Sequence, residues 1–191
     1  MNPADEIILI KQCKDGDQAA FERIVLTYRD RIYNLCRYML GNPQDAEDAA
    51  QDVFIKAYQN LKHFKPHASL YTWLYRIAIN TSIDYRRKRL SFWGSLWRDS
   101  SREEDLLNHQ PSSILSPEQL YTSKELGKSI QFALQKLSTK LRTILILKEI
   151  EGLSYEEIAA ILKISIGTVK SRLSRAREEM KKLLKEVTEQ R

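Results

Sequence analysis

Three carboxylates recur along one stretch of the chain at a spacing that could support chemistry. Asp45, Asp48 and Asp52 follow one another at three- and four-residue steps, so a helix would place them on one face. Such a face could hold a metal ion for phosphodiester cleavage, bind a basic protein, or serve only as a solvated surface. Because the stripe has no histidine partner, a metal-dependent nuclease is the weakest of these interpretations.

A second group with chemical potential lies just downstream, where His63, Phe64, Lys65, His67 and Ser69 surround Pro66. Two histidines four residues apart could bind a metal on a helix, but Pro66 argues against a regular helix and no third ligand is evident. An aromatic ring, two imidazoles and a cation in a short loop suit another task, which is to hold an unstacked nucleic-acid base beside a phosphate.

The third group is cationic and lies near the end of the chain. Lys170, Arg172, Arg175 and Arg177 stand in a segment from Ser165 to Arg177 that contains no acidic residue. A solvated helix face usually interleaves glutamates with its cations. This segment therefore favours contact with the phosphates of a nucleic acid.

The elements that must position these groups are predicted to be helices. Apolar residues recur at three- and four-residue steps over 5–13, 17–39, 44–61 and 70–89, and again from residue 124 to the end of the chain. The segment between residues 90 and 123 is rich in Ser, Pro and acidic residues, with an unusual aromatic cluster from Phe92 to Trp97. The chain is thus predicted to be all-α, with two small helical domains at 1–90 and 124–191 and a flexible linker at 91–123.

Composition narrows the partners of these domains. Lys plus Arg number 31 against 25 Asp plus Glu, giving a net charge of +6, which favours a polyanion. No stretch approaches the roughly 18 to 20 apolar residues of a membrane span, and acids near the N-terminus do not suit a signal peptide. We therefore expect a cytoplasmic protein whose two cysteines, Cys13 and Cys36, are free thiols.

The second domain carries a helix pair with a short turn. Ser154 and Glu157 form a capping-box pattern that starts one helix, and Ser165 can cap the next. We expect the two helices to pack through apolar residues on their facing sides: Ile158, Ala159 and Leu162 on the first, and Ile166, Val169 and Leu173 on the second. Two helices joined by three residues predict a helix-turn-helix, whose second helix enters the major groove of DNA.

The segment from Leu141 to Arg177 resembles region 4 of sigma-70-family factors, especially the extracytoplasmic-function group. One departure is Ser138 after Leu137, where the family usually has proline; serine can also cap a helix. The resemblance implies that the second helix reads the minus 35 promoter element. The residues expected to contact this element are Ser165, Gly167, Thr168, Lys170, Ser171, Arg172, Ser174 and Arg175.

The first domain supplies the matching context. Residues 45–58 resemble region 2.2 of these factors, which grips the beta-prime clamp of RNA polymerase, and residues 72–80 resemble regions 2.3 and 2.4. The resemblance implies polymerase binding by Asp45, Glu47, Asp48, Gln51, Asp52 and Phe54. It implies that the loop before the second segment holds a base flipped from the minus 10 strand. The residues expected at this element are His63, Phe64, Lys65, His67, Ala68, Ser69, Tyr75, Arg76, Asn80, Arg86 and Arg87. Trp73 is expected in the core, and Tyr71 is left open between core and surface.

Together these resemblances imply a sigma factor that directs core polymerase to promoters and has no catalytic residue of its own. The implied partners are core polymerase, through its beta-prime clamp and beta flap, promoter DNA and an anti-sigma protein in a stress or envelope response. Neither a cofactor, a metal nor a small-molecule substrate is expected. The alternatives are a stand-alone helix-turn-helix repressor or response-regulator effector, for which the acidic stripe has no purpose, and the metal-dependent nuclease.

Overall fold

The computed structural model describes residues 3–64, 69–96 and 117–189, and side chains from 5–64, 69–89 and 126–186. Every regular element in these ranges is a helix, which confirms the predicted all-α class. The first domain contains α1 (Pro3–Lys14), α2 (Gln18–Leu40), α3 (Pro43–Asn60), the short 3-10 helix η1 (Leu61–His63) and α4 (Leu70–Leu96). The second contains α5 (Pro117–Lys136), α6 (Thr139–Leu145), the π-helical turn η2 (Ile146–Ile150), α7 (Tyr155–Leu162) and α8 (Ile166–Glu189).

Local sequence sets the ends of α2 and α3. The Asp17 side chain accepts hydrogen bonds from the amides of Ala19 and Ala20 and so caps the start of α2. Gly41 ends α2 with φ of 82°, a left-handed conformation that costs glycine little. Asn42 then caps α3 through the amide of Gln44, and proline occupies the first turn, where its missing N–H is harmless. The tight turn between the two helices follows from these residues.

Small side chains bring the first domain together. Ala46, Ala49, Ala50, Val53 and Ala57 line the buried face of α3, and that helix packs against both α2 and α4. Alanine on a helix face lets the neighbouring backbone approach closely. The apolar face that the sequence predicted for α3 is therefore confirmed. The acidic residues of α3 lie outside this buried face.

Helices reach further toward the linker than the sequence suggested. The fourth helix runs on to Leu96 and α5 already starts at Pro117, whereas the sequence placed the corresponding limits near residues 89 and 124. Arg and Lys are good helix formers, so the basic run at 86–89 does not end α4. Proline at the first helical position starts α5 instead of breaking it. Trp97 and residues 98–116 lie outside the described residues, as does most of the predicted linker.

Arg142 organises the second domain from its interior. Its side chain is fully buried and donates to the carbonyl oxygens of Leu134 and Leu137 near the end of α5, at 2.5 and 3.0 Å. Burial, reinforced by the nearby Arg86 and Arg89, lowers the pKa of Arg142 to about 9. Ser138 lies at the N-cap of α6 but makes no capping hydrogen bond through its side chain. The arginine, and not the serine, ties α5 to α6.

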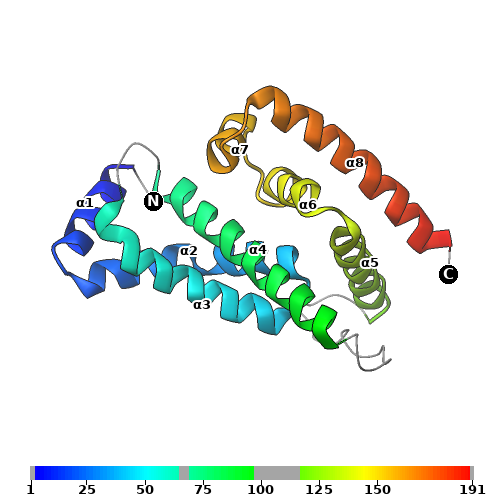
Figure 1. Cartoon of the computed structure of the whole chain (residues 1–191), viewed down its shortest axis with the longest axis horizontal. Coiled ribbons are helices and arrows are strands. Elements are labelled where there is room, and N and C mark those ends of the chain that lie inside the picture. Colours follow the sequence, from blue (N-terminus) through cyan, green and yellow to red (C-terminus); the bar gives the residue numbers. More distant parts are fainter. Residues whose placement is uncertain (1–2, 65–68, 97–116, 190–191) are drawn as a thin grey trace.

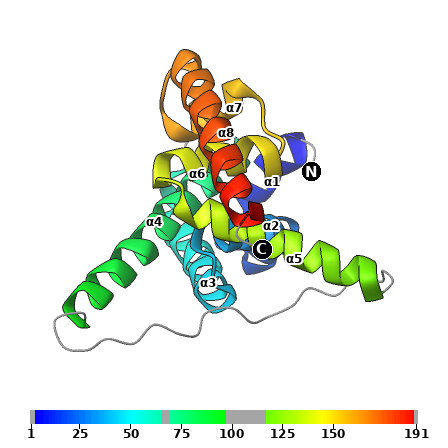
Figure 2. The same cartoon turned by 90° about the vertical axis from the view of Figure 1, so that its right-hand side faces the viewer.

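The two domains pack directly against each other. Figure 1 shows α5 to α8 lying along one side of the α1 to α4 bundle, and the turned view in Figure 2 shows the same contact from the end. Helix α2 contacts α5 and η2, while α4 contacts α7. Buried apolar residues of both domains belong to one continuous cluster. The faces that lie at this junction are therefore covered in this structure.

Candidate nucleic-acid interface

The predicted helix-turn-helix is confirmed in α7 and α8. Ser154 and Glu157 form the complete capping box at the start of α7. The turn depends on Lys163, whose φ of 55° is left-handed, and Ser165 then accepts a hydrogen bond from the amide of Thr168 at 3.1 Å. These local bonds fix the angle at which α8 leaves α7.

The facing residues of the two helices differ in part from the prediction. Ile158 and Val169 are buried as expected, and Ile161 is buried beside them, whereas Leu162 is only half-buried. Ile166 was expected in the contact but is 40% exposed. It lies in the first turn of α8, and helical side chains lean toward the N-terminus, so Ile166 projects past the end of the helix toward solvent.

The outer face of α8 presents the residues predicted for the minus 35 element. Two of the eight, Thr168 and Arg172, are partly exposed. The other six are fully exposed: Ser165, Gly167, Lys170, Ser171, Ser174 and Arg175. The Ser171 hydroxyl bonds back to the carbonyl oxygen of Thr168 at 3.2 Å. The Lys170 ammonium lies 5.7 Å from the centre of the Tyr155 ring, a cation–π distance. Cations and short hydroxyl donors thus share one face.

The acidic residues of α3 fall into two groups. Glu47 and Asp48 are exposed, as is the neutral Gln51 near them. Asp45 forms an ion pair with Arg89 at 3.3 Å, and Asp52 accepts a hydrogen bond from the Tyr85 hydroxyl at 2.9 Å. Both of these acids therefore join α3 to α4, which the sequence spacing did not reveal.

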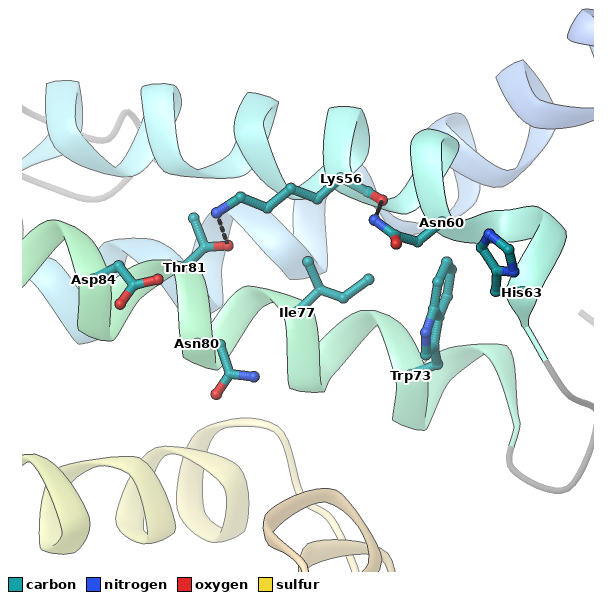
Figure 3. A pocket seen from close by; sticks show the side chains of 8 residues that line it. All are labelled: Lys56, Asn60, His63, Trp73, Ile77, Asn80, Thr81 and Asp84. Carbon is teal, nitrogen blue, oxygen red and sulfur yellow. Dashed lines mark hydrogen bonds between the residues drawn. The ribbon is translucent and has the colours of Figure 1, made fainter.

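A pocket of about 430 Å³ lies between α3 and α4. Figure 3 shows His63 and Trp73 at one end, Asp84 at the other, and Lys56 reaching toward Thr81. The Lys56 ammonium donates to the Thr81 hydroxyl at 3.0 Å. The pocket is lined by Lys56, Asn60, His63, Trp73, Ile77, Asn80, Thr81 and Asp84. An aromatic ring beside hydrogen-bonding groups of both kinds could accommodate a flat polar ring.

Sequence reasoning found only part of this pocket. His63 and Asn80 were predicted to contact DNA, whereas Trp73 was assigned to the core. In the structure Trp73 packs partly against the core and partly lines the pocket. Five lining residues were missed: Lys56, Asn60, Ile77, Thr81 and Asp84. The spacing of Lys56 and Asn60 on α3, and of Thr81 and Asp84 on α4, places each pair on one helix face and is the signal that could have found them.

The loop that leads to α4 is described only at its ends. Phe64 was predicted to contact a base, but it is buried and packs against Trp73 with ring centres 5.2 Å apart. Phe64 therefore contacts the pocket residue Trp73 from the side of the hydrophobic core. Burial of its large ring stabilises this contact. His63 and Ser69 are exposed, and Ser69 caps the start of α4 through the amide of Thr72 at 3.2 Å. Lys65, His67 and Ala68 lie outside the described residues.

The basic track along α4 is only partly open. Asn80 and Arg87 are exposed, and Arg87 pairs with Asp84 at 3.1 Å. Tyr75 is fully buried and donates its hydroxyl hydrogen to Glu151 of the second domain. Burial, reinforced by the hydrogen bond to Glu151, raises the pKa of Tyr75 well above its usual range. Tyr75 is therefore not exposed in this structure, and its contact with the minus 10 strand stays a prediction.

Arg76 and Arg86 of the same track also contact the second domain. Arg76 donates to the carbonyl oxygens of Ala160 and Ile161, the latter at 3.2 Å. Arg86 lies 3.4 Å from the carbonyl oxygen of Gln135, and burial lowers its pKa. The second domain thus occupies three of the side chains that were predicted to contact the minus 10 strand.

The described part of the chain contains no set of side chains that could bind a metal ion. There, no three His, Cys, Asp or Glu side chains cluster as a metal site would require. Over the same residues, no helix combines the length and apolar character needed to cross a membrane.

Comparison with known proteins identifies the family. Residues 24–91 match the Sigma-70 region 2 family, and residues 127–180 match the Sigma-70, region 4 family. The chain belongs to the sigma-70 family, in its extracytoplasmic-function (ECF) group. It is therefore a transcription initiation factor and not an enzyme, which confirms the resemblance and leaves no place for the nuclease or stand-alone repressor alternatives.

The individual similarities extend over both domains. The chain is 42% identical to the ECF RNA polymerase sigma factor SigW of Bacillus subtilis, over 93% of this chain and 96% of that protein. It is 38% identical to the ECF RNA polymerase sigma-E factor of Escherichia coli, over 90% of each.

Two solved structures are similar in fold. CnrH in complex with the cytosolic domain of CnrY has a TM-score of 0.68 at 27% identity and covers 95% of this chain and 97% of that one. The sigma factor RpoE in complex with the anti-sigma factor NepR from Bartonella quintana has a TM-score of 0.66 at 28% identity. The match covers 86% of this chain and 96% of that one.

Proposed function

We propose that this sigma factor places core polymerase on promoters through three surfaces of its two domains. The outer face of α3 binds the beta-prime clamp, the α3–α4 pocket takes a base of the minus 10 strand, and α8 reads the minus 35 element. The observation that carries this assignment is the pairing of an exposed helix-turn-helix face with a polar, aromatic pocket in the other domain. A stand-alone repressor needs only the exposed helix-turn-helix face and has no use for the pocket.

Clamp binding rests on the acids that α4 does not engage. Glu47 and Asp48 are exposed on α3, with Gln51 beside them, and exposed carboxylates attract a basic protein surface. Asp45 and Asp52 play a second part, since their bonds to α4 hold the docking helix against the DNA-binding helix. Phe54 is half-buried and packs against the core below this face.

Base capture uses the pocket between α3 and α4. Trp73 offers a ring for stacking, while Lys56 and Asn80 offer donors at the wall. A base lifted out of the duplex costs a few kcal/mol of unstacking, and aromatic stacking returns about 1 to 3 kcal/mol of it. Arg87 lies on the exposed side of α4 and can meet a phosphate of the same strand. We include Lys65, His67 and Ala68 in this site on the sequence resemblance alone.

Duplex contact at the minus 35 element belongs to α8. Residues near the start of a recognition helix lie nearest the base edges, which favours Thr168, Lys170 and Ser171 together with Arg172 one turn further on. Arg175 lies still further along the exposed face and suits a phosphate contact. Mixed base and phosphate contacts give both specificity and salt-dependent affinity.

A groove in the second domain suits a further polymerase contact. It encloses about 470 Å³ between α5, η2 and α8 and has an apolar floor: Ile130, Leu134, Leu145, Ile150, Met180 and Leu184. Glu149 and Arg177 pair at its edge. We assign it to the beta flap, because an apolar groove with a polar rim accepts one face of an amphipathic helix.

Regulation follows from the relatives. RpoE is bound to an anti-sigma factor in its solved structure, and we propose the same kind of inhibitor for this chain, in a stress or envelope response. Because polymerase works in the cytoplasm, we place the chain there. The proposed activity needs no cofactor and no small-molecule substrate.

The clamp assignment is tested by binding fluorescently labelled chain to purified core polymerase. Asp48→Lys should weaken binding at least about tenfold, because it places a cation against a basic surface. Glu22→Lys makes the same charge change at an exposed position on α2 and should leave the affinity within about twofold of the parent. Equal affinities for the parent and Asp48→Lys would remove α3 from the docking surface.

A further inference from the structure

Helix α1 is bonded both to the end of η1 and to the start of α4. The Lys14 ammonium donates to the carbonyl oxygen of Phe64 at 2.7 Å, and the Glu6 carboxylate accepts from the amide of Leu70 at 2.5 Å. The two bonds span 50 and 64 positions of the sequence. Figure 1 shows α1 at the end of the first domain where α4 begins. One short helix therefore holds the residues on either side of the segment 65–69.

Both bonds engage backbone groups that the helices themselves leave unpaired. The amide of Leu70 lies in the first turn of α4, where an N–H has no acceptor within the helix, and the helix dipole favours a carboxylate there. The carbonyl oxygen of Phe64 follows the last residue of η1 and likewise has no helical donor. Lys14 and Glu6 are half-buried, and a surrounding of low dielectric strengthens such charged hydrogen bonds.

The position of α1 is itself fixed. Leu9 and Ile10 are buried, and α1 contacts α2 and η1. Gly16 joins α1 to α2 with φ of 97°, a left-handed conformation that costs glycine little. The amide of Asp17 bonds back to the carbonyl oxygen of Gln12 at 3.0 Å. Because α1 is held in this way, its two charged side chains hold their partners in place.

The partners of α1 lie next to the pocket between α3 and α4. Phe64 packs against Trp73 with ring centres 5.2 Å apart, and Trp73 lines the pocket together with His63. Leu70 lies in the same first turn of α4 in which the amide of Trp73 bonds to the carbonyl oxygen of Ser69 at 3.2 Å. Figure 3 shows His63 and Trp73 together at one end of the pocket. A shift of Phe64 or Leu70 would therefore move the aromatic wall of the pocket.

We propose that α1 is a positioning element of the minus 10 site, in which Lys14 and Glu6 hold the aromatic end of the pocket in place for a base. Neither residue lines the pocket, so both act through the backbone groups that they bond. The role rests on the proposed capture of a base in this pocket. Helix α1 ends before the match to Sigma-70 region 2 begins at residue 24, so that match assigns it no part. A site held in its binding geometry loses less order on binding and so has a higher affinity.

The first test uses holoenzyme and a promoter fragment that is selected by run-off transcription from a random library and opened at the minus 10 element. Lys14→Met and Glu6→Met should each weaken binding at least about fivefold, because a backbone group loses its charged partner. Affinity for a fragment that carries only the duplex minus 35 element should not change. Unaltered affinity of both variants for the opened fragment would overturn the proposal. An equal loss on the two DNAs would also overturn it, because it would show general damage to the chain.

The matched controls are Lys11→Met and Asp5→Met, which make the same charge changes at exposed positions of α1. Charge alone alters affinity for DNA, so each variant is compared with the control of its own net charge. Lys14→Arg keeps a donor and Glu6→Gln keeps an acceptor, so both should recover most of the lost affinity. Losses in the two controls as large as those in Lys14→Met and Glu6→Met would refute a specific role for the two bonds.

The second test measures the restraint on α4 in the full chain without DNA. Hydrogen exchange of the Leu70 amide, followed by nuclear magnetic resonance, should be at least about fivefold faster in Glu6→Met than in Asp5→Met, because the amide loses its acceptor. Equal exchange rates in these two variants would contradict the proposal.

Trp73→Ala separates the role of α1 from the function on which it rests. If Trp73→Ala binds the opened fragment as the parent does, the pocket captures no base, and the proposed function fails together with the role of α1. If Trp73→Ala weakens binding whereas Lys14→Met and Glu6→Met do not, only the role of α1 fails.

Discussion

The Tyr85 hydroxyl donates a hydrogen bond to the carboxylate of Asp52, 2.9 Å away, and joins the docking helix to the DNA-binding helix. Burial, reinforced by this bond and by the charges of Asp52, Asp48 and Asp45, raises the pKa of Tyr85 to about 12. Two acids of one stripe therefore differ in task, since Asp48 faces solvent.

Asp52→Ala should destabilise the chain, because it removes a hydrogen bond between two helices. We expect a loss of about 0.5 to 1.5 kcal/mol in the free energy of unfolding. Asp48→Ala changes an exposed side chain and should stay within about 0.5 kcal/mol of the parent. Urea unfolding followed by circular dichroism measures both. Equal losses in the two variants would mean that the Tyr85 bond adds nothing to stability.

Replacing Arg142 should be far more damaging. Arg142→Met removes the donor to carbonyl groups of α5 and α2 and leaves several buried acceptors unpaired. We expect a loss of about 3 kcal/mol or more. Lys140→Met, at an exposed position on the same helix, is the control and should change thermal stability little. A melting temperature for Arg142→Met close to that of the control would refute this assignment.

The pocket residue Trp73 should matter for strand capture. Trp73→Ala removes the ring on which a base would stack, at an expected cost of about 1 to 3 kcal/mol in holoenzyme affinity for a promoter opened at the minus 10 element. Affinity for a fragment that carries only the duplex minus 35 element should not change. Trp73→Phe keeps a ring and should recover most of the loss. A uniform loss on both DNAs would indicate damage to the fold of the first domain.

Arg172 tests the reading of the upstream element. Arg172→Ala should cost about 1 to 3 kcal/mol and relax base preference at one position if the guanidinium contacts base edges. Selection of minus 35 sequences from a randomised promoter library measures both effects. Lys182→Ala, further along α8 and paired with Glu178, is the control. An equal loss on every sequence would assign Arg172 to a phosphate contact.

Acidity should favour the contact between the two domains of the free chain, in which Tyr75 donates to Glu151. Burial, partly opposed by Tyr75 and Arg31, raises the pKa of Glu151 above its ordinary value of 4.5, so the chain binds a proton more readily with its domains in contact than with them apart. The fraction of chains with the domains in contact should therefore grow as the pH falls through the range between the raised and the ordinary pKa, and shrink as the pH rises through it. Interdomain distances measured at about pH 7.5 and about pH 5 check the sign. In Glu151→Gln this dependence should weaken.

Local chemistry made much of the fold predictable. The capping box at Ser154, the cap at Ser165 and the alanine face of α3 depend on residues a few positions apart, and all three are present. The helix limits beside the linker do not follow from local sequence, because Pro117 can end one helix or begin another. Its position in the first turn of α5 is visible only once the helix is placed.

The remaining features of the site depend on residues far apart in the chain. Phe64 was expected to face a base, yet the pairing of η1 with α4 buries it against Trp73. The sequence predicts that Arg76 contacts DNA. Its hydrogen bond to the carbonyl oxygen of Ile161 is visible only once α7 is placed beside α4. No local pattern records which carbonyl oxygen of one domain lies opposite a donor of the other.

Transcription itself tests the central claim most directly. Purified core polymerase, free of any other sigma factor, is incubated with a library of promoter fragments with and without this chain, and the run-off transcripts are sequenced. We predict new transcripts that begin at a fixed distance downstream of two shared sequence elements, and their loss with Asp48→Lys. Identical transcripts with and without the chain would contradict the account.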